Sequence, residues 1–78
     1  MKSQNYDNKR FFDNGYGISI ICKPYMSYGW EKGLFEIAVL KGNEDNWTID
    51  YTTPITDDVI GYLDKDEVKE YIERIKSL

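Results

Sequence analysis

The sequence predicts an α+β domain, an antiparallel meander of three to four strands with one C-terminal helix packed on one face (ββββα). In residues 33–41, the large apolar side chains Phe35, Ile37 and Val39 alternate with smaller or polar ones. A side-chain period of two is typical of a strand that has one face against a core. Further alternating segments lie on both sides of it, and an apolar stripe at helical spacing lies near the C-terminus.

The chain of 78 residues is expected to form one small domain over residues 9–78, preceded by a flexible N-terminal arm over residues 1–8. Asn14-Gly15 favours a tight hairpin turn, because both residues tolerate positive φ. This turn would join a short strand before it to a second strand over residues 16–23.

The middle of the chain contains the two clearest later strands. Pro24 is expected to end the strand before it, because proline has no backbone N–H to donate. Leu34 and Leu40 make the second face of the strand over residues 34–41 partly apolar, which favours a central position in the sheet. Residues 46–52 also alternate. Trp47, Ile49 and Tyr51 would face the core, and Thr48 and Asp50 would face solvent.

The C-terminal third predicts helical structure. Thr56 is a candidate cap for a short helical turn over residues 57–60, which Gly61 would end. Asp64 is a good N-cap for the final helix, and Glu67 stands at the capping-box position. The apolar residues that follow recur at helical spacing and predict one buried stripe. They are Val68, Tyr71, Ile72 and Ile75.

One helix is too narrow to cover the whole predicted sheet. A helix is about 10–12 Å across, whereas three or four strands at about 4.8 Å spacing make a wider surface. Part of a sheet face is therefore expected to need another cover. The candidates are the segment Tyr25–Trp30 and a second copy of the chain, which would make the protein a homodimer.

The residue types argue against catalysis. The chain has no histidine and a single cysteine, Cys22, so Ser-His-Asp and Cys-His arrangements and thiolate zinc sites cannot be built. Walker A and dinucleotide-binding glycine patterns are absent. Cys22 falls on the core face of its strand and is interpreted as a small buried hydrophobe. We expect no catalytic residue, no metal site and no cofactor.

Charge is unevenly distributed. The formal net charge is −4. Residues 1–43 carry six Lys or Arg and four Asp or Glu, whereas residues 44–78 carry four Lys or Arg and ten Asp or Glu. The acidic half argues against broad contact with nucleic-acid phosphates, which needs a basic stripe. Its carboxylates either keep the domain soluble or form a surface for a basic partner. The candidates for that surface are Asp57, Asp58, Asp66, Glu70 and Glu73.

The segment between the second and central strands is aromatic and has no clean period. Tyr and Trp are enriched at binding hot spots, so Tyr25, Tyr28 and Trp30 are candidate anchors for a partner, with Glu31 and Lys32 at the rim. The same rings could instead cover the core as a lid. A third alternative is stacking on unpaired bases, supported by the lysines of this half, Lys23, Lys32 and Lys41.

Three segments carry a resemblance. Ser27-Tyr28-Gly29, the strand from Gly33 to Val39, and the stretch from Thr53 to Leu63 together resemble a group of small bacteriophage proteins of unknown function. The resemblance covers roughly residues 13–78. It implies a phage origin and work in the cytoplasm of an infected bacterium, and it implies no site residues.

These observations lead to one main hypothesis and two alternatives. The main hypothesis is a non-catalytic protein that binds a host or phage protein in the bacterial cytoplasm. A single cysteine fits that reducing compartment, and the sequence shows neither a hydrophobic signal region nor a bilayer-length apolar run. The first alternative is an acidic nucleic-acid mimic that blocks a defence protein. The second is a small protein that binds single-stranded nucleic acid.

Overall fold

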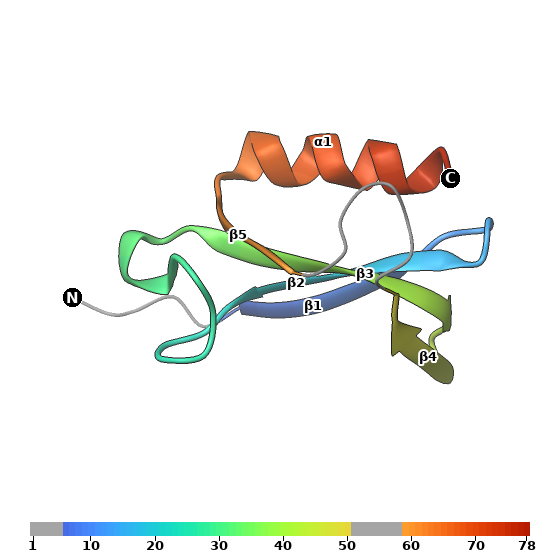
Figure 1. The fold of residues 1–78 in the computed structure, drawn as a ribbon, viewed down its shortest axis with the longest axis horizontal. Helices are drawn as coiled ribbons and strands as arrows, with labels where there is room; N and C mark the ends of the chain where they lie inside the picture. The colour runs from blue at the N-terminus through green and yellow to red at the C-terminus, as the bar shows by residue number, and fades with distance from the viewer. Residues whose placement is uncertain (1–5, 51–58) are drawn as a thin grey trace.

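The computed structural model describes residues 6–50 and 59–78. Within these ranges the chain forms an antiparallel sheet, a short 3-10 helix and one α-helix, and the expected ββββα fold is confirmed with a short additional strand (Figure 1). The strands are β1 Tyr6–Phe11, β2 Tyr16–Cys22, β3 Phe35–Asn43, β4 Asn46–Ile49 and β5 Ile60–Leu63. The helices are η1 Trp30–Lys32 and α1 Lys65–Lys76.

β3 is the centre of the sheet, as its two apolar faces predicted. β2 pairs with one of its sides, and β1 pairs with the far side of β2. The other side of β3 is shared by two short strands. β4 pairs with residues 40–43, and β5 pairs with the opposite end, where Phe35 stands against Leu63.

The first hairpin turns where Asn14-Gly15 predicted. The Phe12 N–H donates to the Tyr16 carbonyl over 2.8 Å, and Gly15 has a φ of 85°. Asn14 has a second role that the turn signal did not indicate. Its side-chain amide donates to the carbonyls of Ile75 (2.9 Å) and Lys76 at the end of α1. The turn thereby ties the sheet to the C-terminal carbonyls of the helix, which lack partners within it.

The expected arm over residues 1–8 is wrong for residues 6–8, which belong to β1. Contacts with residues farther along the chain hold residues 6–8 in the sheet. The Tyr6 ring meets Phe35 edge-on at a centroid distance of 5.6 Å, and the Asp7 carboxylate lies 2.8 Å from the Lys23 ammonium. The hydrogen bond from Lys23 lowers the pKa of the Asp7 carboxyl.

The core lies between the sheet and α1. Its members come from β2, β3, β5 and α1: Ile18, Ile20, Ile37, Val39, Leu63, Val68 and Ile75. The helix begins as predicted. The Glu67 N–H donates to Asp64 Oδ1 over 2.8 Å, and the Asp64 N–H donates to Glu67 Oε1 over 3.0 Å, which completes the capping box.

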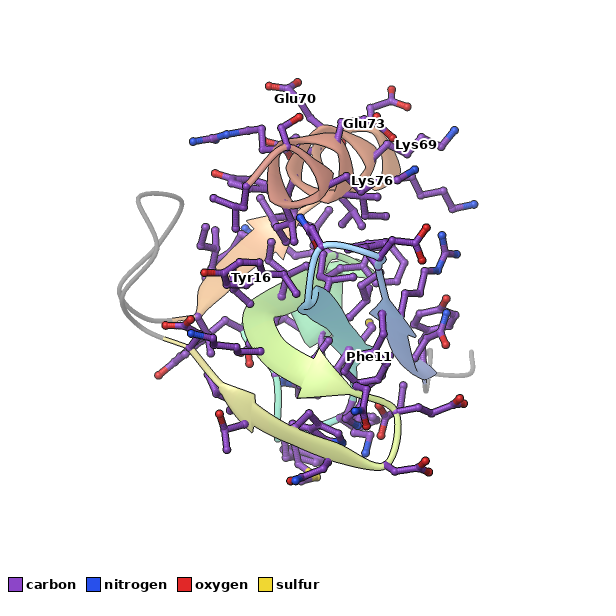
Figure 2. The ribbon with its side chains drawn as sticks, turned by 90° about the vertical axis from the view of Figure 1, so that its right-hand side faces the viewer. Phe11, Tyr16, Lys69, Glu70, Glu73 and Lys76 are labelled. Atoms are coloured by element: carbon purple, nitrogen blue, oxygen red, sulfur yellow. The ribbon has the colours of Figure 1, made fainter. Side chains whose placement is uncertain are left out.

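The face of the sheet away from α1 is covered by β4 and aromatic side chains. β4 lies on this side of the sheet in Figure 1, and Figure 2 shows Phe11 on the same side. The Lys9 ammonium of β1 lies 5.3 Å from the centre of the Trp47 ring of β4, so the two outer strands meet across this face. Leu40 beneath them is fully buried. The cover expected from residues 25–30 therefore comes from β4.

Three side chains at β4 contradict the faces expected for this strand. Trp47 and Ile49, predicted to face the core, are 37% and 40% exposed, and Asp50, predicted to face solvent, is 8% exposed. The register explains the exposure, because it places Trp47 and Ile49 opposite Gly42 and Leu40, on the face of the sheet away from the core under α1. The Asp50 N–H donates to the Val39 carbonyl over 2.8 Å. Tyr51 lies outside the described residues.

The short helical turn expected over residues 57–60 is wrong at its described end. Ile60 begins β5 and pairs with Ile37 of the central strand, and Gly61 continues the strand where we expected it to end a helix. The glycine signal was misread because Gly61 is needed for packing. A Cβ there would overlap the Cβ of Tyr28.

Cys22 is fully buried, as predicted, and burial raises the pKa of its thiol. We expect the native protein not to react with a water-soluble disulfide reagent, because the thiolate is the reactive form. Reaction should begin only in denaturant. Because the folded-state pKa is raised, stability should be unaffected below the usual thiol pKa and should fall as pH rises above it.

The measurement is thiol titration with and without denaturant, together with unfolding curves across alkaline pH. A Cys22→Ala variant serves as the control, since it should lack this part of the pH dependence. Rapid stoichiometric labelling of the native protein would contradict the buried position.

Candidate partner-binding surface

The loop between β2 and β3 contains three aromatic residues. It lies at the end of the molecule opposite the β1–β2 turn (Figure 1). We define the aromatic patch as Tyr25, Met26, Tyr28 and Trp30 of this loop together with Tyr62 of β5. Tyr25 is 89% exposed, Tyr28 is 62% exposed and Tyr62 is 54% exposed. These exposures contradict the core-lid alternative for Tyr25 and Tyr28. Met26 is also exposed, and Trp30 is half-buried.

The first half of the loop is fixed by a turn around Ser27, which is buried. The N–H groups of Met26 and Ser27 both donate to the Lys23 carbonyl, over 3.0 and 3.1 Å. In return, the Lys23 N–H donates to Ser27 Oγ over 2.8 Å. The tip of the loop, with Tyr25 and Met26, is therefore presented on a hydrogen-bonded frame.

The second half of the loop is docked on β5. The Tyr28 N–H donates to Glu36 Oε1 over 2.9 Å, and the Tyr28 carbonyl accepts from the Tyr62 N–H over 3.3 Å. Gly29 permits this close approach, because a Cβ there would lie 3.1 Å from the Cα of Tyr62. Gly29 also has a φ of 95°, a conformation that glycine adopts at little cost.

Two residues of the patch have left-handed backbones although they are not glycine. Tyr25 has a φ of 63° and Tyr62 a φ of 58°. At Tyr62 the cause is a β-bulge: two residues of β5, Gly61 and Tyr62, stand opposite the single residue Glu36. Such conformations cost stability and concentrate at functional sites. The exposed Tyr62 ring at this bulge lines the same hollow as the loop residues.

The patch surrounds a hollow of about 300 Å³. Its lining consists of Tyr25, Met26, Ser27, Tyr28, Gly29, Trp30, Glu31 and Tyr62. The rings of Tyr25 and Trp30 touch at a centroid distance of 4.7 Å. Tyrosine and tryptophan offer a large contact area with few rotatable bonds, so they lose little entropy on binding. The arrangement suits recognition of another surface by apolar contact and hydroxyl hydrogen bonds.

The rim residues lie where the sequence placed them. Glu31 and Lys32 are exposed on η1, directly after Trp30. The structure thus brings all five predicted contact residues to one end of the molecule. Sequence reasoning missed Met26 and Tyr62. Met26 lay inside the predicted segment, and the Gly61-Tyr62 pair was a usable signal for a bulge.

Replacing Tyr62 by asparagine is expected to raise the free energy of unfolding by about 0.5–1 kcal/mol, because asparagine tolerates positive φ better than tyrosine. The same change should weaken partner binding about tenfold, since it removes an exposed ring from the patch. Denaturant unfolding and a binding titration measure the two effects. Tyr62→Phe is the matched control and should change neither. A less stable Tyr62→Asn protein would contradict the strain at this position.

The predicted acidic surface is only partly described. Asp66, Glu70 and Glu73 are exposed on α1, and Figure 2 shows Glu70 and Glu73 on the side of the helix away from the sheet. Asp57 and Asp58 lie outside the described residues. Within α1, four acidic residues alternate with four basic ones, and the Lys76 ammonium lies 3.6 Å from the Glu73 carboxylate. The helix surface is therefore mixed in charge.

The lysines proposed to support base stacking do not form one stripe. Lys23 pairs with Asp7, and Lys41 lies 6.0 Å from the centre of the Tyr16 ring. Lys32 is exposed on η1, next to the aromatic patch. The three lysines thus have different neighbours, and of the three it is Lys32 that stands next to the aromatic patch.

Over residues 6–50 and 59–78, no three His, Cys, Asp or Glu side chains come together in a way that could hold a metal ion. In the same part of the chain, no helix has the length and apolar character needed to cross a membrane. No family model, curated protein or solved structure matches the chain.

Proposed function

We propose that this chain is a non-catalytic binding protein that docks onto a host or phage protein through the aromatic patch. The observation that carries the proposal is the exposure of large rings on a loop that hydrogen bonds hold to the sheet. Isolated exposed apolar residues are ordinary on protein surfaces, but a cluster of them on one loop is typical of an interaction site.

The anchoring of the loop strengthens the proposal. Tyr28 and Tyr62 are joined through their backbones, and Gly29 and Gly61 allow that junction. A surface that is already ordered loses less conformational entropy when a partner binds, so more of the contact energy contributes to affinity. The backbone strain at Tyr25 and Tyr62 is consistent with selection for exposure of these rings.

The setting we propose is the cytoplasm of an infected bacterium. The phage origin is supported by the resemblance of residues 27–29, 33–39 and 53–63 to small bacteriophage proteins. The compartment is supported by the single cysteine, Cys22, because a chain with one cysteine forms no internal disulfide.

The experiment is capture of partners from nuclease-treated bacterial lysate by the tagged protein at moderate salt, read by mass spectrometry. We expect a protein that is retained by the wild type and lost from a Tyr28→Ala/Trp30→Ala variant. Equal capture by both would contradict the aromatic patch.

Two further measurements separate the alternatives. Capture that collapses steeply with salt but survives the double substitution would support the acidic mimic. Retardation of single-stranded DNA or RNA at low salt would support the nucleic-acid alternative.

A further inference from the structure

β1 is an edge strand with one strand neighbour, β2, in the described part of the chain. The bond from the Phe12 N–H to the Tyr16 carbonyl sets the alternation along this pair. In an antiparallel ladder, every second residue points its N–H and C=O groups at the partner, and the residues between point theirs outward. By this alternation, the backbone groups of Asp7, Lys9 and Phe11 face away from β2. They form a template onto which a further strand can add.

A groove runs beside this edge, between β1 and α1. It has a volume of about 250 Å³ and exists because α1 packs over β2, β3 and β5 and leaves the helix side of β1 open. Its floor is apolar and comes from three elements. The floor residues are Ile20, Phe35, Val68 and Ile72.

The rim of the groove is cationic. Arg10 of β1 and Lys65 and Lys69 of α1 line it. Among residues 6–50 and 59–78, none of the three takes part in an ion pair; the pairs there join Asp7 with Lys9 and Lys23, and Glu73 with Lys76. Three cations that form no ion pair in the described part of the chain thus border one apolar groove, in a protein whose net charge is −4.

We propose that this edge and groove bind an extended segment of a partner protein, one that places a long apolar side chain between acidic side chains. The segment adds to β1 as a further antiparallel strand, through the outward backbone groups of Asp7, Lys9 and Phe11. Its apolar side chain enters the groove, and its carboxylates meet Arg10 and Lys69. In strand addition, main-chain hydrogen bonds supply affinity and the pockets for alternate side chains supply specificity. This site goes beyond the proposed function, because it shares no residue with the aromatic patch.

Charge favours such a segment over a second copy of the chain. The side chains that β1 itself turns toward the helix side are Tyr6, Asn8 and Arg10, which follow from the register with β2. A second β1 would therefore bring another arginine to the cationic rim, where like charges repel. It would also offer no aliphatic side chain to the groove.

The test uses a blocked peptide, Thr-Glu-Thr-Leu-Thr-Glu-Thr, titrated into ¹⁵N-labelled protein at millimolar concentrations. In a strand, its Leu and both Glu side chains lie on one face. We expect the amide signals of Asp7, Lys9 and Phe11 to shift and to become protected from hydrogen exchange. A peptide with Lys in place of both Glu residues should bind about tenfold more weakly.

Charge reversal supplies the second arm. An Arg10→Glu/Lys69→Glu variant should reverse the preference and favour the Lys peptide. Lys76→Glu is the matched control: it changes the charge two turns farther along α1, outside the groove, and should leave the preference unchanged. The Tyr28→Ala/Trp30→Ala variant should bind the Glu peptide like the wild type, which separates this site from the proposed function.

Several results would overturn the proposal. One is that the amide signals of β1 do not change when the Glu peptide is added. Another is that the Glu and Lys peptides bind with equal affinity. A third is that signals of the groove side chains shift while the β1 amides gain no protection from hydrogen exchange. Protection of the same amides in peptide-free protein, increasing with protein concentration, would assign the edge to a second copy.

Discussion

Replacing Tyr28 and Trp30 together by alanine is expected to weaken partner binding at least about a hundredfold, because two hot-spot aromatic residues each contribute on the order of 2 kcal/mol. Tyr28 is an exposed member of the patch, and the Trp30 ring contacts the Tyr25 ring at a centroid distance of 4.7 Å. The double change removes the exposed Tyr28 ring and the ring that contacts Tyr25. Calorimetric titration of the purified partner measures the loss.

The fold should survive this double substitution. The loop is held by backbone bonds and by Ser27 Oγ, and alanine leaves these in place. Trp47→Ala is the matched control, because it removes a partly exposed tryptophan from β4, far from the patch in the sheet. Its affinity should match the wild type. An unchanged affinity in the double variant, with the circular dichroism spectrum preserved, would rule out the patch.

Ile75→Ala is expected to lower the free energy of unfolding by about 2–5 kcal/mol, because it leaves a cavity in a packed core. Ile75 is fully buried where α1 meets the sheet. Small domains of this size have a total stability of only about 4–12 kcal/mol, so the variant should be close to unfolding at room temperature. Urea denaturation followed by tryptophan fluorescence gives the value.

Two comparisons make this result specific. Ile75→Val removes a single methyl group and should cost about 0.5–1.5 kcal/mol. Ile49→Ala makes the same chemical change as Ile75→Ala at a position that is 40% exposed, and its effect should be smaller. Equal losses for Ile49→Ala and Ile75→Ala would mean that α1 does not pack on the sheet as described.

The parts of the fold that the sequence predicted depend on local signals. Asn14-Gly15 specifies its turn through the conformations of its own two residues. The Asp64–Glu67 capping box joins groups only three residues apart. The alternation in β3 needs no partner to be visible, and its two apolar faces already indicate a central strand.

The parts that were missed depend on contacts between distant residues. β1 begins at Tyr6 because the Tyr6 ring meets Phe35 and the Asp7 carboxylate pairs with Lys23, and both partners lie elsewhere in the chain. β5 is a four-residue strand that exists through its pairing with Phe35 and Ile37. A strand so short has too few residues for a period of two to be recognised. Its glycine, Gly61, is also a residue type that commonly ends helices.

The residues of the candidate site also fall into those that local sequence signals predicted and one that depends on contacts between distant residues. The residue types of the loop indicated Tyr25, Tyr28 and Trp30, because a cluster of aromatic residues in a segment without a strand or helix period is visible in the sequence. Tyr62 joins them only through the β-bulge opposite Glu36 and the bond to the Tyr28 carbonyl. The sequence could not decide whether the rings were buried, because that depends on how β4 covers the far face.

The most direct test of the central claim is hydroxyl-radical footprinting of the protein alone and with its captured partner, read by mass spectrometry. The patch consists of readily oxidised side chains, and Trp47 and Tyr6 serve as exposed references elsewhere on the fold. We expect the partner to protect Tyr25, Met26, Tyr28 and Tyr62 and to leave Trp47 unchanged. Oxidation of the patch at the same rate with the partner bound would contradict the claim.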